Sequence, residues 1–317
     1  MTVSLRDVLE AESVIRPHIR TTPAMEVDPA DFGLDWGGRL TLKLECLQHA
    51  GSFKPRGAFA TLLAPARETG PVVAVSGGNH GAAVGHVAKA LGLDATIFVP
   101  EYAPKAKMEL IRSFGADLRV VGATIAETFG AYEAFIAETG ARDVHPYAAP
   151  ATIAGQGTLG LEWAAQSPDL DAVLIAIGGG GLISGVAAAM QAGPAVIGVE
   201  PEGARCAYEA RRAGAPVDFP PKSIAADSLG APSIGALNHD IIDDYVDDLV
   251  LVPDDAIREA QLAIRRRIGM VVEAGAATAL AALMCGAVTP EPGAHIGALV
   301  CGSNVDLSQF DGAVGAD

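Results

Sequence analysis

The strongest constraint on the fold is a regular alternation of strand and helix patterns along the chain. Short apolar runs that predict buried strands lie at 72–76, 95–100, 117–121, 172–177, 195–199 and 298–301, and helical patterns follow at 82–91, 104–114, 125–139 and 182–190. A strand, a helix and a further strand within about 30 residues form a parallel crossover. The sequence therefore predicts an α/β fold with two doubly wound lobes and mostly parallel sheets.

Composition excludes two classes of partner. Asp and Glu outnumber Lys and Arg by 38 to 22, which gives a net charge of −16 at pH 7. Binding to a phosphate backbone needs a basic face, and an aromatic content of 5% is low for a base-stacking platform. The longest uncharged Ala-rich stretch, 274–288, is shorter than the ~20 residues that cross a bilayer. We expect neither a nucleic-acid nor a membrane partner.

The cysteines indicate a reducing compartment. Cys46, Cys206, Cys285 and Cys301 are far apart, and no CxxC pair occurs. A chain of this length with four scattered cysteines does not indicate a disulfide framework or a zinc site. The segment 1–15 carries charged residues early and lacks an apolar signal core. We therefore expect a cytoplasmic protein.

The strongest local signal is a run of four glycines, Gly178, Gly179, Gly180 and Gly181, between a predicted strand and a predicted helix. Without side chains, successive backbone N–H groups can converge on an anion, and the positive end of the helix dipole adds to the attraction. This pattern predicts a phosphate site. The alternative is a tight turn that needs positive φ angles. Glu200 follows the strand 195–199, so a nucleotide also remains possible.

A second loop joins a predicted strand to a predicted helix and consists of Ser76, Gly77, Gly78, Asn79 and His80. Its small residues, hydroxyl, amide and free N–H groups suit a carboxylate. Its position at the carboxyl end of a strand is where open α/β sheets bind ligands. The alternative is an ordinary loop in which Asn79 caps the helix. We do not expect His80 to act as a catalyst.

A third signal is Lys54, which follows Phe53 in the sequence GSFKPRG. Few charges surround it, and partial burial would lower its pKa and free a nucleophilic amine that can form a Schiff base. Taken alone, Lys54 could be a surface lysine on a loop. Together, an amine, a phosphate cradle and a carboxylate cradle are what pyridoxal 5'-phosphate (PLP) chemistry on an amino acid requires.

Six motifs make the sequence resemble a known family. GSFKPRGA, SGGNHG, GQGT, GGGGL, VEPEGA and CGSNVD occur in one order over residues 22–306. With them the chain resembles the threonine/serine dehydratase and serine racemase family, which has the tryptophan-synthase-β-like PLP fold (fold type II). The resemblance implies a large cofactor-binding domain, 1–69 and 149–317, and a small mobile substrate domain, 70–148.

The resemblance also implies roles for the three signals. Lys54 would hold PLP as a Schiff base, Phe53 would lie against its ring, and Asn79 would contact the ring hydroxyl. Cys301 would face the ring nitrogen. The phosphate would lie on the glycine run, Gly178 to Gly181, and the substrate carboxylate on the loop from Ser76 to His80.

Two positions depart from the family pattern. Racemases of the group carry a second serine, the base on the opposite face of the ring, where this chain has Gly77. The cation site of the group matches at Glu200 and Ala204, but a carboxylate is replaced by Cys206. Magnesium prefers oxygen ligands. We therefore expect little racemase activity and no metal, with Glu200 capping a strand end and pairing with an arginine such as Arg205.

These inferences predict a PLP-dependent ammonia-lyase that converts L-threonine and/or L-serine to a 2-oxo acid and ammonia. Lys54 would remove the α-proton, and the β-hydroxyl would leave, protonated through the cofactor phosphate. The alternatives are a serine racemase or a 3-hydroxyaspartate dehydratase of the same family. Further alternatives are a β-replacement enzyme and a non-catalytic PLP- or amino-acid-binding protein. We expect a homodimer.

Overall fold

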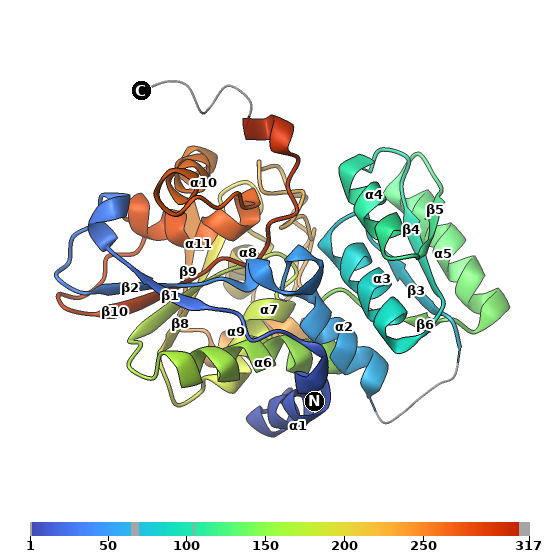
Figure 1. Cartoon of the computed structure of the whole chain (residues 1–317), viewed down its shortest axis with the longest axis horizontal. Coiled ribbons are helices and arrows are strands. Elements are labelled where there is room, and N and C mark those ends of the chain that lie inside the picture. The colour runs from blue at the N-terminus through green and yellow to red at the C-terminus, as the bar shows by residue number, and fades with distance from the viewer. Residues whose placement is uncertain (1, 65–69, 104, 311–317) are drawn as a thin grey trace.

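Two parallel-stranded sheets lie side by side in the computed structural model, which describes residues 2–64, 70–103 and 105–310 (Figure 1). The larger sheet has the strand order β1-β2-β10-β7-β8-β9, and the smaller has the order β5-β4-β3-β6. All neighbouring strands are parallel except β1 and β2, which are antiparallel.

The larger sheet consists of β1 (Ala24–Val27), β2 (Arg39–Lys43), β7 (Ala172–Ala176), β8 (Ala195–Pro201), β9 (Asp248–Val252) and β10 (His295–Leu299). Its helices are α1 (Leu5–Ile15), α2 (Lys54–Leu63), α6 (Pro150–Gln166), α7 (Gly181–Ala189), α8 (Cys206–Ala213), α9 (Ala236–Tyr245), α10 (Asp254–Ile268) and α11 (Ala274–Met284). Helices α10 and α11 cover one face, and α6 and α7 cover the other (Figure 1). Because both faces are covered, all five residues of β7 are buried.

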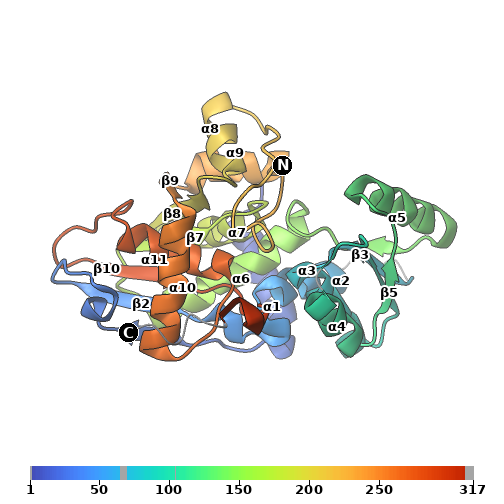
Figure 2. The ribbon, with the colours of Figure 1, turned by 90° about the horizontal axis from the view of Figure 1, so that it is seen from above.

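The smaller sheet consists of β3 (Val72–Val75), β4 (Ala95–Val99), β5 (Asp117–Val120) and β6 (Arg142–Asp143). Its helices are α3 (Asn79–Leu91), α4 (Lys105–Ser113) and α5 (Ile125–Thr139). Figure 2 shows α5 on one face of this sheet and α3 and α4 on the other. The strands fall within the predicted range 70–148. The mobility of this lobe and its boundaries stay predictions.

The predicted α/β fold with two lobes of mostly parallel sheet is confirmed. Two elements begin three residues earlier than predicted, whereas the other predicted boundaries differ by at most two residues. Helix α3 begins at Asn79 rather than at 82, because Asn79 and His80 already form its first turn. The last strand is His295–Leu299 rather than 298–301, because Cys301 lies beyond the sheet in the wall of a pocket. The pattern did not predict β1, β2, β6 or β9.

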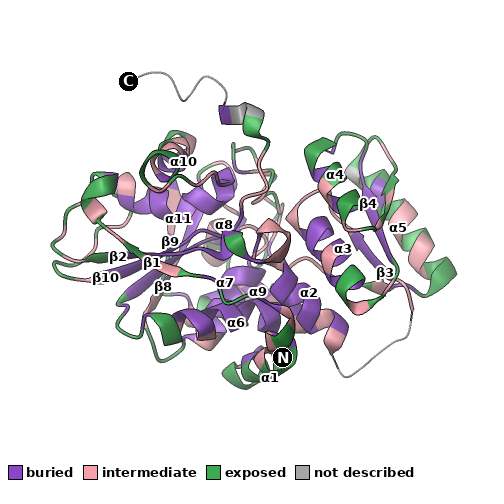
Figure 3. Ribbon diagram, in the orientation of Figure 1, coloured by how far each residue is buried: buried purple, intermediate pink, exposed green. Residues whose placement is uncertain are grey.

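The buried residues concentrate in the strands of the larger sheet and in the helices that flank it, as the purple segments of Figure 3 show. The largest fully buried side chain is that of Trp163 on α6. In the described part of the chain, no helix is both long and apolar enough to cross a membrane.

Candidate active site

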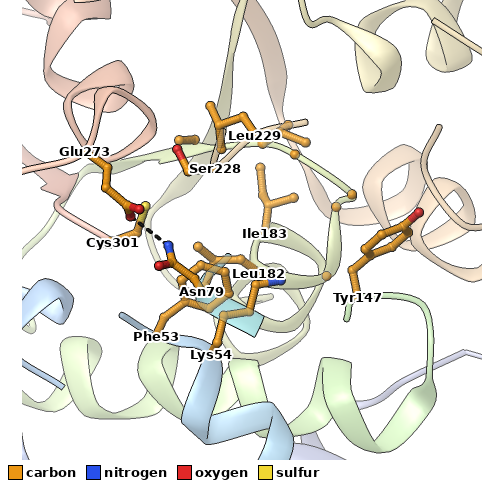
Figure 4. Close-up of a pocket in the computed structure, with 16 residues that line it drawn as sticks. Phe53, Lys54, Asn79, Tyr147, Leu182, Ile183, Ser228, Leu229, Glu273 and Cys301 are labelled. Atoms are coloured by element: carbon orange, nitrogen blue, oxygen red, sulfur yellow. Dashed lines mark hydrogen bonds between the residues drawn. The ribbon is translucent and has the colours of Figure 1, made fainter. Parts of the chain in front are cut away.

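A pocket lies where residues of both lobes meet, next to the carboxyl end of β7 (Figure 4). It brings together the predicted cofactor residues Phe53, Lys54, Asn79, Gly178, Gly179, Gly180, Gly181 and Cys301. A larger cavity of about 570 Å³ adjoins it, and Lys54, Asn79 and Gly179 line both. The predicted substrate residues Ser76, Gly77, Gly78, Asn79 and His80 line this larger cavity. The catalytic and binding roles of these residues stay predictions.

Lys54 is the first residue of α2, and its side chain rises into the middle of the pocket (Figure 4). Its Nζ donates a hydrogen bond to the carbonyl oxygen of Pro146 at 2.8 Å and lies 5.0 Å from the ring centre of Phe53. Burial lowers the pKa of Lys54 to about 8, although the nearby Cys301 acts in the opposite direction. A substantial fraction of this amine is therefore neutral near pH 8 and able to act as a nucleophile or a base.

A buried ionic network holds the helix that carries Lys54. Arg56 Nε pairs with Glu45 Oε1 at 2.6 Å, and Arg56 Nη2 pairs with Glu162 on α6 at 3.1 Å. Helix α6 approaches α2 closely at Gly155, where a Cβ would lie 2.6 Å from the carbonyl oxygen of Arg56. This close approach explains why the first glycine of the GQGT motif has no side chain.

The glycine run forms an open loop that ends at the start of α7. Gly180 has φ +87°, which favours glycine. A methyl group added at Gly179 would collide with the ring of Tyr147, and one at Gly181 would lie 2.6 Å from the carbonyl oxygen of Tyr147. No described residue accepts a hydrogen bond from the N–H of Gly179 or Gly180, and no side chain caps α7. Free N–H groups at a helix start fit a phosphate.

Asn79, the first residue of α3, is held by two residues of the other lobe. Its Nδ2 donates to Glu273 Oε2 at 2.7 Å, and its Oδ1 accepts from Asn304 Nδ2 at 2.8 Å. The amide nitrogen carries two hydrogens, and the second is not used by any described residue. Asn79 can therefore keep its hydrogen bond to Glu273 and still donate the second hydrogen to a ligand hydroxyl.

Two further buried groups face the same pocket. Burial raises the pKa of Glu273 to about 7, an effect that Lys107, with Nζ 3.5 Å from Oε1, partly offsets. Burial also raises the pKa of Cys301 above the usual thiol range, so this thiol stays neutral. A neutral thiol beside a pyridine nitrogen cannot stabilise a full positive charge on it as a carboxylate would.

The loop 76–80 exposes backbone and small side chains to the larger cavity. Ser76 Oγ accepts from the N–H of Gly78 at 3.2 Å. His80 Nε2 lies 2.6 Å from the carbonyl oxygen of Val144, which can only accept, so Nε2 carries the proton. Burial, together with Lys54, lowers the pKa of His80 to about 3. His80 is therefore neutral near pH 7, and the expectation that it does not act as a catalyst stays a prediction.

Glu273, Tyr147 and Asn238 were not singled out from the sequence. Glu273 had a weak signal, because it is the only carboxylate at the head of the uncharged stretch 274–288. Tyr147 and Asn238 had none. Both reach the glycine loop only through the fold.

The predicted pairing of Glu200 with Arg205 is wrong. Glu200 is buried, and its two oxygens accept from the N–H groups of Ala207 at 2.9 Å and Tyr208 at 2.7 Å. The carboxyl group therefore caps α8, while Arg205 pairs with Glu209. Across residues 2–64, 70–103 and 105–310, no group of three or more His, Cys, Asp or Glu side chains is arranged to hold a metal.

An amine, a neutral thiol and a loop of free N–H groups that line one pocket suit a cofactor that has an aldehyde, a phosphate and a weakly basic ring. The protein is thus of the class of enzymes that depend on such a cofactor. Residues 15–302 match the family described as pyridoxal-phosphate dependent enzyme, and the chain belongs to this family. Its fold is the tryptophan-synthase-β-like fold of PLP enzymes.

Similar proteins include dehydratases and a racemase. The chain is 38% identical to phenylserine dehydratase of Ralstonia pickettii, with 93% of this chain and 91% of the relative covered. It is 34% identical to the catabolic L-threonine dehydratase TdcB of Staphylococcus aureus, with 98% and 92% covered. The solved structure of maize serine racemase matches with a TM-score of 0.92 and 34% identity over 99% of this chain and 97% of that chain. The solved structure of the T.th. threonine deaminase matches with a TM-score of 0.88 and 37% identity over 96% and 99%. The protein is therefore a PLP-dependent enzyme of the dehydratase and racemase family.

Proposed function

We propose that the protein is an ammonia-lyase that converts L-threonine and/or L-serine to a 2-oxo acid and ammonia. The observation that carries the proposal is the geometry of Lys54. Its partly neutral amine lies between a loop of free N–H groups and a loop that has no side chain at Gly77. One base without an opposing second base favours elimination over racemisation.

In the proposed reaction, different residues of the chain have different roles. PLP, when bound, withdraws electrons from the α-carbon of an amino acid and makes its proton acidic. Lys54 Nζ takes this proton, and the backbone of 76–80 holds the carboxylate of the substrate. Asn79 of the small lobe and Glu273 of the large lobe would hold the ring, and the neutral Cys301 would not stabilise a full positive charge on its nitrogen.

A second candidate is a β-aryl substrate such as phenylserine. The cavity beyond Lys54 has aromatic residues in its wall, namely Tyr102, Phe129, Tyr132 and Tyr147. The phenylserine dehydratase relative supports the same interpretation. By contrast, 3-hydroxyaspartate would bring a second carboxylate next to Asp143 and Asp227. Lys107 in the same cavity is already paired with Asp227 at 3.1 Å.

A release assay tests these candidates. The holoenzyme is incubated with the L- and D-forms of serine and threonine, with phenylserine and with 3-hydroxyaspartate, and 2-oxo acid and ammonia are measured. We expect both products from L-threonine or L-serine and none from 3-hydroxyaspartate. Products only in the presence of a thiol co-substrate would identify a β-replacement enzyme. If no substrate gives a product, the protein would be a non-catalytic PLP- or amino-acid-binding protein. The predicted homodimer and cytoplasmic location are not tested by this assay and stay predictions.

We predict that the enzyme forms little D-serine. With L-serine in deuterated water, pyruvate should exceed D-serine by at least about 10-fold, because Gly77 has no side chain that could return a proton to the face opposite Lys54. Chiral chromatography measures the ratio. D-serine in excess of pyruvate would contradict the lyase proposal.

Position 77 offers a gain-of-function variant. A Cβ at Gly77 would lie 2.9 Å from the Cβ of Ala103, so a serine there needs space. We expect Gly77→Ser combined with Ala103→Gly to raise α-proton exchange by at least about 10-fold, with Ala103→Gly alone as the control. Unchanged exchange in the correctly folded double variant would mean that residue 77 does not face the α-carbon.

We predict that turnover does not need a divalent cation. The Glu200 oxygens already accept two backbone hydrogen bonds, and the thiol of Cys206 is a poor ligand for magnesium. Treatment with EDTA, and then addition of magnesium or calcium, should each change kcat by less than about 2-fold, or ~0.5 kcal/mol of barrier. Loss of turnover in EDTA that magnesium restores would show that other oxygen atoms complete a cation site.

A further inference from the structure

Two side chains outside the pocket hold the glycine loop. Asn238 on α9 donates from Nδ2 to the carbonyl oxygen of Gly179 at 2.6 Å. Cys206, the first residue of α8, donates from Sγ to the carbonyl oxygen of Gly178 at 3.4 Å. Neither residue lines the pocket or the larger cavity. Both are buried, so these bonds are shielded from water.

These bonds orient the N–H groups of the loop. In a trans peptide the C=O and the following N–H point in opposite directions, and no cis peptide occurs in the described residues. Because the carbonyl of Gly178 points away from the pocket toward Cys206, the N–H of Gly179 points toward the pocket. In the same way, the carbonyl of Gly179 points toward Asn238, so the N–H of Gly180 points toward the pocket. The carbonyl of Gly180 accepts from Ser184 at 3.0 Å as the first bond of α7, which directs the N–H of Gly181 out of the helix start.

We propose that Asn238 and Cys206 are positioning residues that pre-orient the glycine loop for the cofactor phosphate. This inference rests on the assignment of the loop as the phosphate site. An anion site whose donors are already aligned does not lose affinity to rearrangement when the ligand binds. Neither residue needs to touch the ligand for this effect.

The surroundings of Asn238 support a dedicated donor role. Its Nδ2 also lies 3.2 Å from the carbonyl oxygen of Tyr147, the residue whose ring packs on Gly179. Since both neighbours are carbonyl oxygens, which only accept, the nitrogen rather than Oδ1 must face them. Oδ1 is buried and has no partner among the described residues. A buried amide with one unpaired end costs stability, while its Nδ2 donates to the two carbonyl oxygens at the glycine loop.

The role of Cys206 is the weaker of the two. Burial raises the pKa of Cys206 to about 12, so the group stays a thiol, a weak donor whose single hydrogen is shared between the Gly178 carbonyl and Glu200. The residue stands at the position where the family resemblance implies a cation ligand. In this chain, the same position connects the start of α8 directly to the phosphate loop.

The experiment compares two ligands of the apo-protein. PLP and pyridoxal share the ring and the aldehyde, but only PLP has a phosphate. We expect Asn238→Leu, which keeps the volume and removes the donor, to weaken PLP binding by about 10-fold and pyridoxal binding by less than about 2-fold. Cys206→Ala should weaken PLP binding by about 3-fold, and Cys206→Ser should restore it. Absorbance titration gives both dissociation constants.

A matched control separates positioning from stability. Gln261 is also a buried amide that donates to a backbone carbonyl, that of Val272, and its oxygen also lacks a partner among the residues described. Gln261→Leu should therefore cost comparable stability without changing the preference for PLP over pyridoxal. The ³¹P resonance of bound PLP should move in Asn238→Leu and stay in Gln261→Leu.

Three results would overturn the inference. They are unchanged PLP affinity in folded Asn238→Leu, an equal loss for PLP and pyridoxal, and the same shift in the Gln261→Leu control. Gly180→Val distinguishes this failure from a wrong phosphate site. If Gly180→Val removes the preference for PLP but Asn238→Leu does not, only the positioning role fails. If neither does, the phosphate binds elsewhere.

Discussion

Lys54→Ala is expected to lower the rate of 2-oxo acid release by at least about 10³-fold, or ~4 kcal/mol of barrier. The variant loses both the amine that holds the cofactor covalently and the base that removes the α-proton. Borohydride reduction of the parent holoenzyme followed by peptide mass mapping should place the pyridoxyl group on Lys54. Lys89→Ala, at an exposed position on α3, is the control and should retain the parent rate.

The pH dependence of cofactor uptake provides an independent check on Lys54. The neutral amine is the nucleophile, and burial lowers the pKa of Lys54 to about 8. The rate at which apo-protein takes up PLP should therefore rise with pH up to about 8 and then level off. A rate that continues to rise toward the pKa of an exposed lysine, or a pyridoxyl label on another lysine, would contradict the assignment.

Gly180→Val is expected to weaken PLP binding by at least about 10-fold, because a residue with a Cβ loses about 1–2 kcal/mol at positive φ. The added Cβ would also lie 3.1 Å from the Cβ of Asn238 and 3.3 Å from Ile242 Cδ1. To relieve both strains, the loop would rotate the N–H of Gly180 away from the pocket.

A surface glycine provides the control for this substitution. Gly214, after α8, has φ +69°, and a Cβ there would meet nothing within 4 Å. Gly214→Val should therefore carry the same backbone strain and leave PLP affinity unchanged, as measured by absorbance titration of apo-protein. Equal affinity of Gly180→Val and the parent would mean that the glycine loop is not the phosphate site.

Much of the fold could be predicted because its strands are short apolar runs followed by helices. The three strand–helix units of the small lobe are of this kind, and the helix predicted at 125–139 matches α5. Strand β6 has only two residues, and β1 is an antiparallel strand at the sheet edge. Elements as short or as exposed as these lack a periodic pattern and depend on their neighbours in the sheet.

The candidate site also has a part that local sequence patterns predict and a part that depends on contacts between distant segments. The amine, the anion loop and the substrate loop are contiguous motifs, and each has a local chemical requirement that its own residues meet. Glu273 contacts Asn79 across 194 positions of the chain, and Asn238 reaches Gly179 across 59. A side chain that acts on a distant segment leaves no pattern in its own neighbourhood.

The sequence by itself predicted the fold class, the cofactor and three segments that line the pocket and the adjoining cavity, because strand periodicity, glycine runs and an isolated lysine are local properties of the chain. Only the tertiary structure decided which groups surround those loops. In the folded chain, Glu273 accepts a hydrogen bond from Asn79, and the oxygens of Glu200 cap the start of α8. A Cβ added at Gly180 would point toward α9. Each of these depends on how separate elements pack, and hydrogen bonds and burial between distant segments arise only when the two lobes and their helices come together.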